Sequence, residues 1–360
     1  MQKLLLLCAL LPLSWTKPNA SLINQINSQQ SAWTAGINPF DDIESRLGFL
    51  GIHPDPNFKP EIKEPQATQN VIPETFDARE YWPECADIIG NIRNQGKCSS
   101  SWAFAAAEVM SDRLCIATNG KVKIQLSPED LIDCCHYCGN QCKGGYTYYA
   151  WNYFMLTGLV SGGDYNTSTG CQPYSELNYY RITPPCNTTC QNDKYPIPYV
   201  SDKHFGDSIY YIPQNETAIQ NEILSGGGPV VAAFDVYGDF KIYRDGVYIY
   251  TSGALFGRTA VKIIGWGTEN GWAYWLAANS WGKDWGALGG FFKIRRGTNE
   301  CGFEESIIAG QVREGGSTSP TPVTFTATVT PPTTPGSGVR VAGCGIGLVL
   351  SMMLFYLLKF

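Results

Sequence analysis

The stretch NQGKCSSSWAF, residues 94–104, places three consecutive serines between a cysteine and a tryptophan. Apolar residues then recur at spacings of three and four, which puts them on one face of a helix. These residues are Phe104, Ala107, Met110 and Leu114. Asn119-Gly120 supplies a helix stop. The stretch therefore predicts a long helix with the hydroxyl of Ser101 at its N-terminal end.

Five later runs are rich in Val, Ile, Tyr and Phe and are bounded by Gly or Asn. They are GPVVAAFDVY, GVYIY, TAVKIIGWG, AYWLAANSWG and GFFKIRRG, between residues 228 and 297. This composition predicts an antiparallel sheet or barrel in the second half of the chain. Because helices come first and strands later, the order indicates an α+β fold with two lobes.

The composition is that of a folded protein, because 44% of the 360 residues are hydrophobic and only 16% are charged. The net charge is -6, and the chain has no block of Lys and Arg. We therefore exclude nucleic acid as a partner. The sequence also predicts no cofactor and no metal site.

The N-terminus has the features of a secretory signal peptide, which we assign to residues 1–16. Lys3 precedes the apolar run Leu4–Leu13, which is too short to span a bilayer. Thirteen cysteines indicate an oxidising compartment, where they can pair as disulfides. Four N-x-[ST] sequons are compatible with the same route, and their asparagines are Asn19, Asn166, Asn187 and Asn215.

The C-terminus predicts attachment to a membrane. Residues 314–338 are rich in Ser, Thr and Pro without apolar periodicity, which is typical of an extended stalk. Residues 339–360 form a hydrophobic tail that fits a signal for a GPI anchor. The alternative is a single membrane span, although such spans usually leave several basic residues on the cytoplasmic side. Only Lys359 is available there.

Several motifs resemble the cathepsin B-like branch of the papain-type cysteine peptidases. QGKCSSSWAF resembles the family's Q-G-x-C-G-S-C-W-A-F, and GRTAVKIIGWG resembles G-G-H-A-x-x-I-x-G-W-G. NSWG is intact at residues 279–282, and WTAG at 33–36 matches the short propeptide. The resemblance implies a two-lobed papain-like fold with a helical left lobe, an antiparallel barrel-like right lobe and a cleft between them. We assign residues 17–72 to the propeptide and 73–313 to the papain-like domain.

The resemblance places Ser101 at the position of the nucleophilic cysteine and Thr259 at that of the histidine, with Asn279 as the intact orienting residue. A cysteine thiolate is stabilised by an imidazolium and by a helix N-terminus. A serine hydroxyl ionises several pH units higher and depends on a base, and threonine has no lone pair basic enough to serve. The two replacements do not compensate for each other.

The chain has three histidines that a replacement base could come from. His53 lies in the predicted propeptide, His136 lies in a cysteine cluster, and His204 lies in DKHFG. We interpret all three as structural or solvated residues.

The binding apparatus that the resemblance implies is largely kept. Gln95 matches the oxyanion-hole amide, and Trp281 matches the shield of the orienting asparagine. Gly144 and Gly145 match the strip that pairs with an extended peptide, with a tight turn beside a disulfide as the alternative. Ser306 stands where the family has an acidic residue in the S2 pocket, which puts a preference for basic side chains in doubt. Residues 171–190 lack the histidines with which cathepsin B grips a C-terminal carboxylate.

Eleven cysteines lie between Cys85 and Cys301, and their spacing alone does not select a connectivity. The resemblance implies the pairs Cys85-Cys115, Cys98-Cys142, Cys134-Cys186, Cys135-Cys138 and Cys171-Cys190. It leaves Cys301 unpaired. A zinc site at the C-x-x-C of Cys135 and Cys138 is a less favoured alternative.

We therefore predict a secreted, surface-anchored pseudopeptidase that binds a peptide or protein in a retained cleft, with its own propeptide as a further partner. Two alternatives stay open. One is a weak or atypical peptidase that uses Ser101. The other is a structural or adhesion protein that uses another surface of the fold.

Overall fold

The computed structural model of the chain describes residues 20–38, 61–65 and 71–313. They all belong to one compact unit, residues 1–319. The predicted signal peptide, the stalk and the C-terminal tail lie outside the described residues, as does His53. Within the described ranges, no helix has the length and apolar character needed to cross a bilayer.

The helix predicted from residues 94–104 is α4, Ser101–Ala117. It begins at Ser101, and its residues up to Cys115 are all buried. Asn119 and Gly120 follow it with φ of 49° and 72°, so the predicted stop is confirmed. The other described helices are α1 Ala20–Gln29, α2 Ala78–Tyr81, α3 Ala86–Ile89, α5 Pro128–Cys134, α6 Thr147–Leu156, α7 Glu176–Tyr179 and α8 Glu216–Ser225.

The strands form one nine-stranded sheet in the order β1-β5-β8-β7-β6-β4-β9-β3, with β2 paired to β6. Their bounds are β1 Trp33–Ala35, β2 Phe76–Asp77, β3 Tyr210–Ile212, β4 Val230–Tyr237, β5 Tyr243–Tyr248, β6 Leu255–Glu269, β7 Trp272–Ala278, β8 Phe291–Arg295 and β9 Ile307–Ala309. The predicted antiparallel pairing holds except between β5 and β8, which are parallel. The amino-acid composition of the two strands cannot predict this parallel pair, because strand direction depends on the path of the chain between them.

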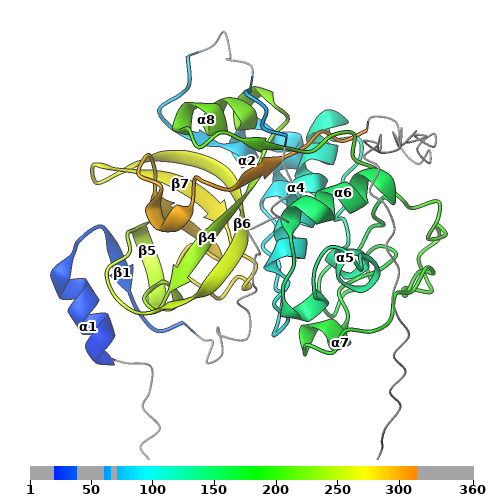
Figure 1. Cartoon of the computed structure of the whole chain (residues 1–360), viewed down its shortest axis with the longest axis horizontal. Helices are drawn as coiled ribbons and strands as arrows, with labels where there is room; N and C mark the ends of the chain where they lie inside the picture. The colour runs from blue at the N-terminus through cyan, green and yellow to red at the C-terminus, as the bar shows by residue number, and fades with distance from the viewer. Residues whose placement is uncertain (1–19, 39–60, 66–70, 314–360) are drawn as a thin grey trace, which may run out of the picture. The chain divides into compact units, whose positions relative to one another are not determined.

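Two large hydrophobic cores divide the described residues into two lobes. One core lies within the sheet and contains five buried tryptophans: Trp33, Trp266, Trp275, Trp281 and Trp285. The other surrounds α4 and contains Trp102 and Trp151. Figure 1 shows the sheet on the left and α4 to α7 on the right, with β6 of the sheet running beside α4. The predicted two-lobed α+β fold is confirmed.

Part of the predicted propeptide is built into the sheet. Strand β1 pairs with β5, with Trp33 opposite Gly246. The Trp33 ring is buried, stacks on Tyr243 at 6.1 Å and donates its Nε1 hydrogen bond to the Ile249 carbonyl at 2.9 Å. Asn38 Nδ2 donates to two further carbonyls, those of Lys241 and Tyr243. Residues 20–38 therefore complete one edge of the β lobe.

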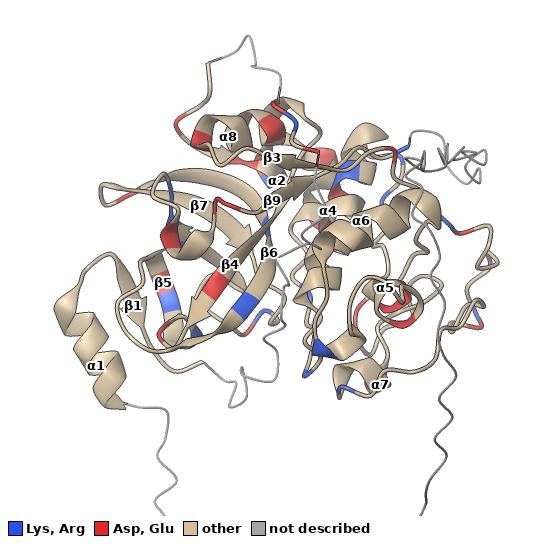
Figure 2. Ribbon diagram, viewed as in Figure 1, with Lys and Arg blue, Asp and Glu red and all other residues tan. Residues whose placement is uncertain are grey.

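Charged residues are dispersed over both lobes. Figure 2 shows short Lys and Arg segments interspersed with Asp and Glu segments throughout the described residues. A nucleic-acid-binding surface needs a concentrated basic stripe. This distribution gives no support to such a surface.

Five disulfides join the described cysteines, and they are the five pairs that the resemblance implied: Cys85–Cys115, Cys98–Cys142, Cys134–Cys186, Cys135–Cys138 and Cys171–Cys190. Four of them lie in the helical lobe, around α4 and α5. The zinc alternative at Cys135 and Cys138 is wrong, because these two sulfurs are bonded to each other. Cys301 is the free cysteine of the described residues.

This framework predicts a definite mass-spectrometric pattern. Non-reducing peptide mapping of residues 73–313 should recover all five pairs, with Cys301 as the one alkylated cysteine. Burial raises the pKa of the Cys301 thiol, so alkylation should require denaturation. A free Cys98 would overturn the registration that puts Ser101 at the nucleophile's position.

Candidate functional site

Ser101 is the first residue of α4 and is fully buried. Its Oγ accepts a hydrogen bond from the backbone N–H of Ala260 on β6 at 3.2 Å. The hydroxyl therefore joins the helical lobe to the β lobe. It also lies at the positive end of the helix dipole, where a negative charge is stabilised.

Thr259 directly precedes Ala260 on β6 and is also fully buried. Its register partner on β4 is Phe234. The Thr259 Oγ1 has no hydrogen-bond partner among the described residues. The strand thus places Thr259 next to Ala260, the residue whose N–H contacts Ser101.

Asn279 follows the last residue of β7 and is fully buried. Its Oδ1 accepts a hydrogen bond from the Ser280 N–H at 2.9 Å. Its Nδ2, in contrast, finds no hydrogen-bond acceptor within the described ranges. A buried polar group without a partner costs roughly 1–3 kcal/mol. The positions of Thr259 and Asn279 therefore each carry an unsatisfied polar atom.

Gln95 is held in place by the loop after β7. The backbone N–H of Gln95 donates to the Ser280 carbonyl at 2.9 Å, and the Ser280 hydroxyl donates to Gln95 Oε1 at 2.7 Å. Gln95 Nε2 donates to the Cys98 carbonyl at 2.7 Å. The Tyr174 hydroxyl donates to the Gln95 carbonyl at 2.9 Å. The amide predicted to serve as the oxyanion donor is thus fixed from both lobes.

Trp281 and Ser306 lie in the β lobe. Trp281 is fully buried in the aromatic core, with its ring 5.1 Å from that of Trp285 and 5.7 Å from that of Phe240. Ser306 directly precedes β9 and is 6% exposed. The described residues contain no hydrogen bond from Ser306 to the other candidate site residues.

Gly145 is tightly packed against its neighbours. A Cβ added there would lie 2.6 Å from the Trp102 ring and 2.7 Å from the Cys138 carbonyl. Gly144 has φ of 113°, which side chains rarely adopt. The alternative for this pair, a tight turn beside a disulfide, therefore describes their local structure.

Sequence reasoning missed an ion network beside two of the candidate positions. Arg258 Nε lies 2.9 Å from Asp235 Oδ1, and its Nη2 lies 3.1 Å from Glu305 Oε1. Arg258 precedes Thr259, and Glu305 precedes Ser306. The register of β4 and β6, which sets Asp235 opposite Arg258, is the signal that could have found this network.

The described histidines do not supply a base. His136 is exposed. His204 exchanges two backbone hydrogen bonds with Leu159, and burial lowers the pKa of its imidazole. No hydrogen bond within the described ranges joins either imidazole to Ser101.

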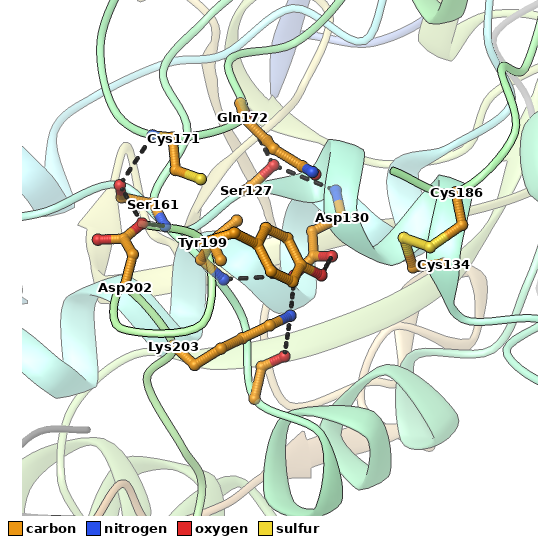
Figure 3. Close-up of polar contacts among 12 residues, drawn as sticks. Ser127, Asp130, Cys134, Ser161, Cys171, Gln172, Cys186, Tyr199, Asp202 and Lys203 are labelled. Atoms are coloured by element: carbon orange, nitrogen blue, oxygen red, sulfur yellow. Dashed lines mark hydrogen bonds and ion pairs between the residues drawn. A yellow bond between two sulfur atoms is a disulfide. The ribbon is translucent and has the colours of Figure 1, made fainter. Parts of the chain in front are cut away.

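A polar network in the helical lobe, drawn in Figure 3, is a structural cluster. The Tyr199 hydroxyl and Lys203 Nζ each donate to Asp130 at 2.7 Å. Asp202 accepts hydrogen bonds from the Ser161 N–H and hydroxyl, both at 2.7 Å. These bonds tie residues 199–203 to α5 and to Ser161, and they leave Asp130 and Lys203 paired with each other. In the described part of the chain, no group of His, Cys, Asp and Glu side chains could hold a metal ion.

Comparisons with known proteins agree with the resemblance. The family model "Papain family cysteine protease" matches residues 72–311. Cathepsin B-like cysteine proteinase 4 of Caenorhabditis elegans is 43% identical over 82% of this chain and 92% of its own length. Cathepsin B-like cysteine proteinase 5 of the same organism is 45% identical, over 81% and 89%. The structure of proCathepsin B S9 from Trypanosoma congolense has a TM-score of 0.70 at 33% identity and covers 82% of this chain and 98% of that one.

The packing around Gly145 predicts that Gly145→Ala lowers the free energy of unfolding by roughly 1–3 kcal/mol, because the new methyl group overlaps the Trp102 ring. Thermal unfolding followed by circular dichroism checks this. Gly271→Ala is the matched control, since a Cβ at Gly271 meets nothing within 4 Å and adds backbone strain alone. Equal stability of the Gly145 variant and the wild-type chain would contradict the packing argument.

Proposed function

The chain belongs to the papain family of cysteine proteases, and from this premise we propose that it is a pseudopeptidase, which binds an extended peptide or protein segment without cutting it. The proposal rests on one observation above all. The residue at the start of the buried helix α4 is Ser101, and the residue next to its partner Ala260 is Thr259. Neither side chain supplies the thiolate or the base that cysteine-peptidase chemistry needs.

The size of the catalytic loss decides between a weak enzyme and a non-enzyme. In a related kind of triad, removal of the nucleophile or the base lowers turnover on the order of a million-fold. This corresponds to roughly 8 kcal/mol of barrier. The groups that remain, Gln95 and Asn279, do not recover an effect of this size.

Two buried polar atoms without partners lie at the positions of the family's base and orienting residue. Thr259 Oγ1 and Asn279 Nδ2 are both buried and have no hydrogen-bond partner among the described residues. In the family, a histidine lies between the nucleophile and the asparagine, and an imidazolium donates through both of its nitrogens. Threonine at residue 259 cannot supply that donor, and Asn279 Oδ1 accepts from the Ser280 N–H instead.

The retained binding apparatus supports a role in recognition. Gln95 is held by Ser280 and Tyr174, so its loop is ordered for contact with a peptide carbonyl. Residues 20–38 remain docked on β5, which supports the chain's own propeptide as a partner. We assign residues 17–72 to this propeptide and 73–313 to the papain-like domain.

The proposed setting is the secretory route. Five disulfides are typical of proteins that fold in an oxidising compartment. Asn166, Asn187 and Asn215 are exposed, as glycosylation requires, and Asn19 lies outside the described residues. We propose a signal peptide over residues 1–16, and a stalk and anchor signal over 314–360, with a GPI anchor as the form of attachment.

One measurement tests binding and chemistry together. A labelled synthetic peptide of residues 39–60 is added to the protein after cleavage behind residue 72. The fluorescence polarisation should rise to saturation, and mass spectrometry should find the peptide intact, because the cleft binds and does not cut. A scrambled peptide is the control.

Each of the other outcomes favours a different alternative. Cleavage of the peptide that disappears in Ser101→Ala would establish an atypical peptidase. An intact peptide that does not bind, or binds no better than its scrambled control, would favour a structural or adhesion protein that uses another surface.

A paired substitution tests the assigned positions. Ser101→Cys with Thr259→His should make the protein react with thiol-directed active-site probes, because a thiolate and an imidazolium stabilise each other as a unit. Each single variant should react much more slowly. Labelling rates measured by intact mass check this, and equal rates in the double variant and in Ser101→Cys alone would show that residue 259 does not face residue 101.

A further inference from the structure

A buried ionic cluster joins α4 of the helical lobe to β6 of the β lobe. Lys262 of β6 is fully buried, and its Nζ lies 2.9 Å from Asp112 Oδ2 and 3.8 Å from Glu108 Oε2, both on α4. The Lys262 ammonium also donates a hydrogen bond to the Ile89 carbonyl at 3.0 Å. Because α4 carries Ser101 and β6 carries Thr259, the cluster connects the two elements that bear the candidate site.

The cluster contains more acid than base. Two carboxyl groups share one ammonium group, and Glu108 Oε1 and Asp112 Oδ1 have no hydrogen-bond partner among the described residues. When both carboxyl groups are ionised, a negative charge remains uncompensated in a site from which water is excluded. Such a charge is costly unless it is paired.

The neighbouring charges do not change this balance. Arg93 also faces the cluster. Its Nε lies 2.6 Å from Asp164 Oδ1, so the positive charge of Arg93 is balanced by the Asp164 carboxylate. Arg113 of α4 likewise pairs with Glu222 at 3.0 Å. The two pairs are neutral overall, and the excess negative charge of the cluster persists.

The imbalance makes the cluster take up a proton close to neutrality. Burial raises the pKa of Glu108 to about 7, and the attraction of Lys262 opposes this shift only in part. Burial likewise raises the pKa of Asp112 to about 6, again against Lys262. Between about pH 6 and 7 the cluster is therefore an Asp112–Lys262 ion pair plus a protonated Glu108, and at lower pH Asp112 is protonated as well.

We propose that Glu108, Asp112 and Lys262 form a proton-controlled lock between the lobes, which holds α4 against β6 in acid and loosens this contact as the pH rises past neutrality. The lock regulates the cleft of the proposed function, on which its biological role rests. Its physical basis is independent of whether the cleft binds or cuts a peptide.

The direction of the pH effect follows from proton linkage. Glu108 has a higher pKa in the folded state, about 7, than its ordinary value of 4.5, so folding takes up a proton between these two values. The stability that this proton contributes is fully present below about pH 4.5, and it is lost as the pH rises from there through about 7. The unfolding equilibrium constant should therefore rise by up to about tenfold per pH unit within this window.

The first test compares the full chain with Glu108→Gln between about pH 5 and about pH 8. Glutamine keeps the shape of the side chain and removes the titration. The melting temperature of the wild-type chain, measured relative to that of the variant, should fall as the pH rises. Asp207→Asn, which neutralises an exposed carboxylate, should follow the wild-type chain. Parallel pH profiles of wild type and Glu108→Gln would overturn the lock.

A second variant keeps the proposal falsifiable if glutamine at residue 108 destabilises the fold. Lys262→Met removes the shared cation, which holds down the pKa of both carboxyl groups. In this variant the carboxyl groups should keep their protons to higher pH, so the loss of stability should extend to higher pH than in the wild-type chain. An unchanged pH profile in Lys262→Met would contradict the role of the ammonium group.

Hydrogen exchange reports on the interface itself. The amide of Ala260, which bonds to Ser101 Oγ, should lose protection in the wild-type chain above about pH 7, after correction for intrinsic exchange, and should keep it in Glu108→Gln. This readout needs no ligand and no turnover. Loss of protection in both proteins would refute the lock and leave the pseudopeptidase proposal untouched, whereas cleavage of added peptides would refute that proposal and leave the lock intact.

Discussion

The burial of α4 is the constraint on which the rest of the structure depends. Every residue of this helix from Ser101 to Cys115 is buried, so its polar side chains must find partners inside the protein. Arg113 finds Glu222 together with several backbone carbonyls, and Ser111 links the Ala107 carbonyl to the Leu126 N–H. The two lobes, the buried ion pairs and the candidate site all follow from placing this one helix between a sheet and a helical layer.

The same constraint explains how the candidate site keeps its form with a serine at residue 101 and a threonine at residue 259. A serine at the start of a buried helix keeps its place because its Oγ accepts a hydrogen bond across the lobes, from Ala260. Asn279 keeps its place because Oδ1 is bound by the Ser280 N–H, although Nδ2 has no acceptor in the described residues. Packing and five disulfides hold the scaffold around these residues in place.

The sequence predicted those features that depend on local pattern. Apolar spacing identified α4 and its stop at Asn119, and Val- and Ile-rich runs identified β4 to β8 but not the short strands β1, β2, β3 and β9. The disulfide pairs came from the resemblance, since spacing alone leaves many connectivities open. Features that depend on long-range register were not predicted. They are the parallel pairing of β5 and β8, the contact of Arg258 with Glu305, and the partners of Lys262. No local pattern encodes which side chains meet when β6 is laid against α4.

The central claim is that Ser101 is chemically inert. The most direct measurement is the intact mass of the protein after incubation with a fluorophosphonate, which labels serine hydroxyls only when a base and an oxyanion site activate them. The account predicts an unmodified protein, since Thr259 supplies no base and neither described histidine is hydrogen-bonded to Ser101. A single adduct that maps to Ser101 would contradict it and would establish an active serine in this fold.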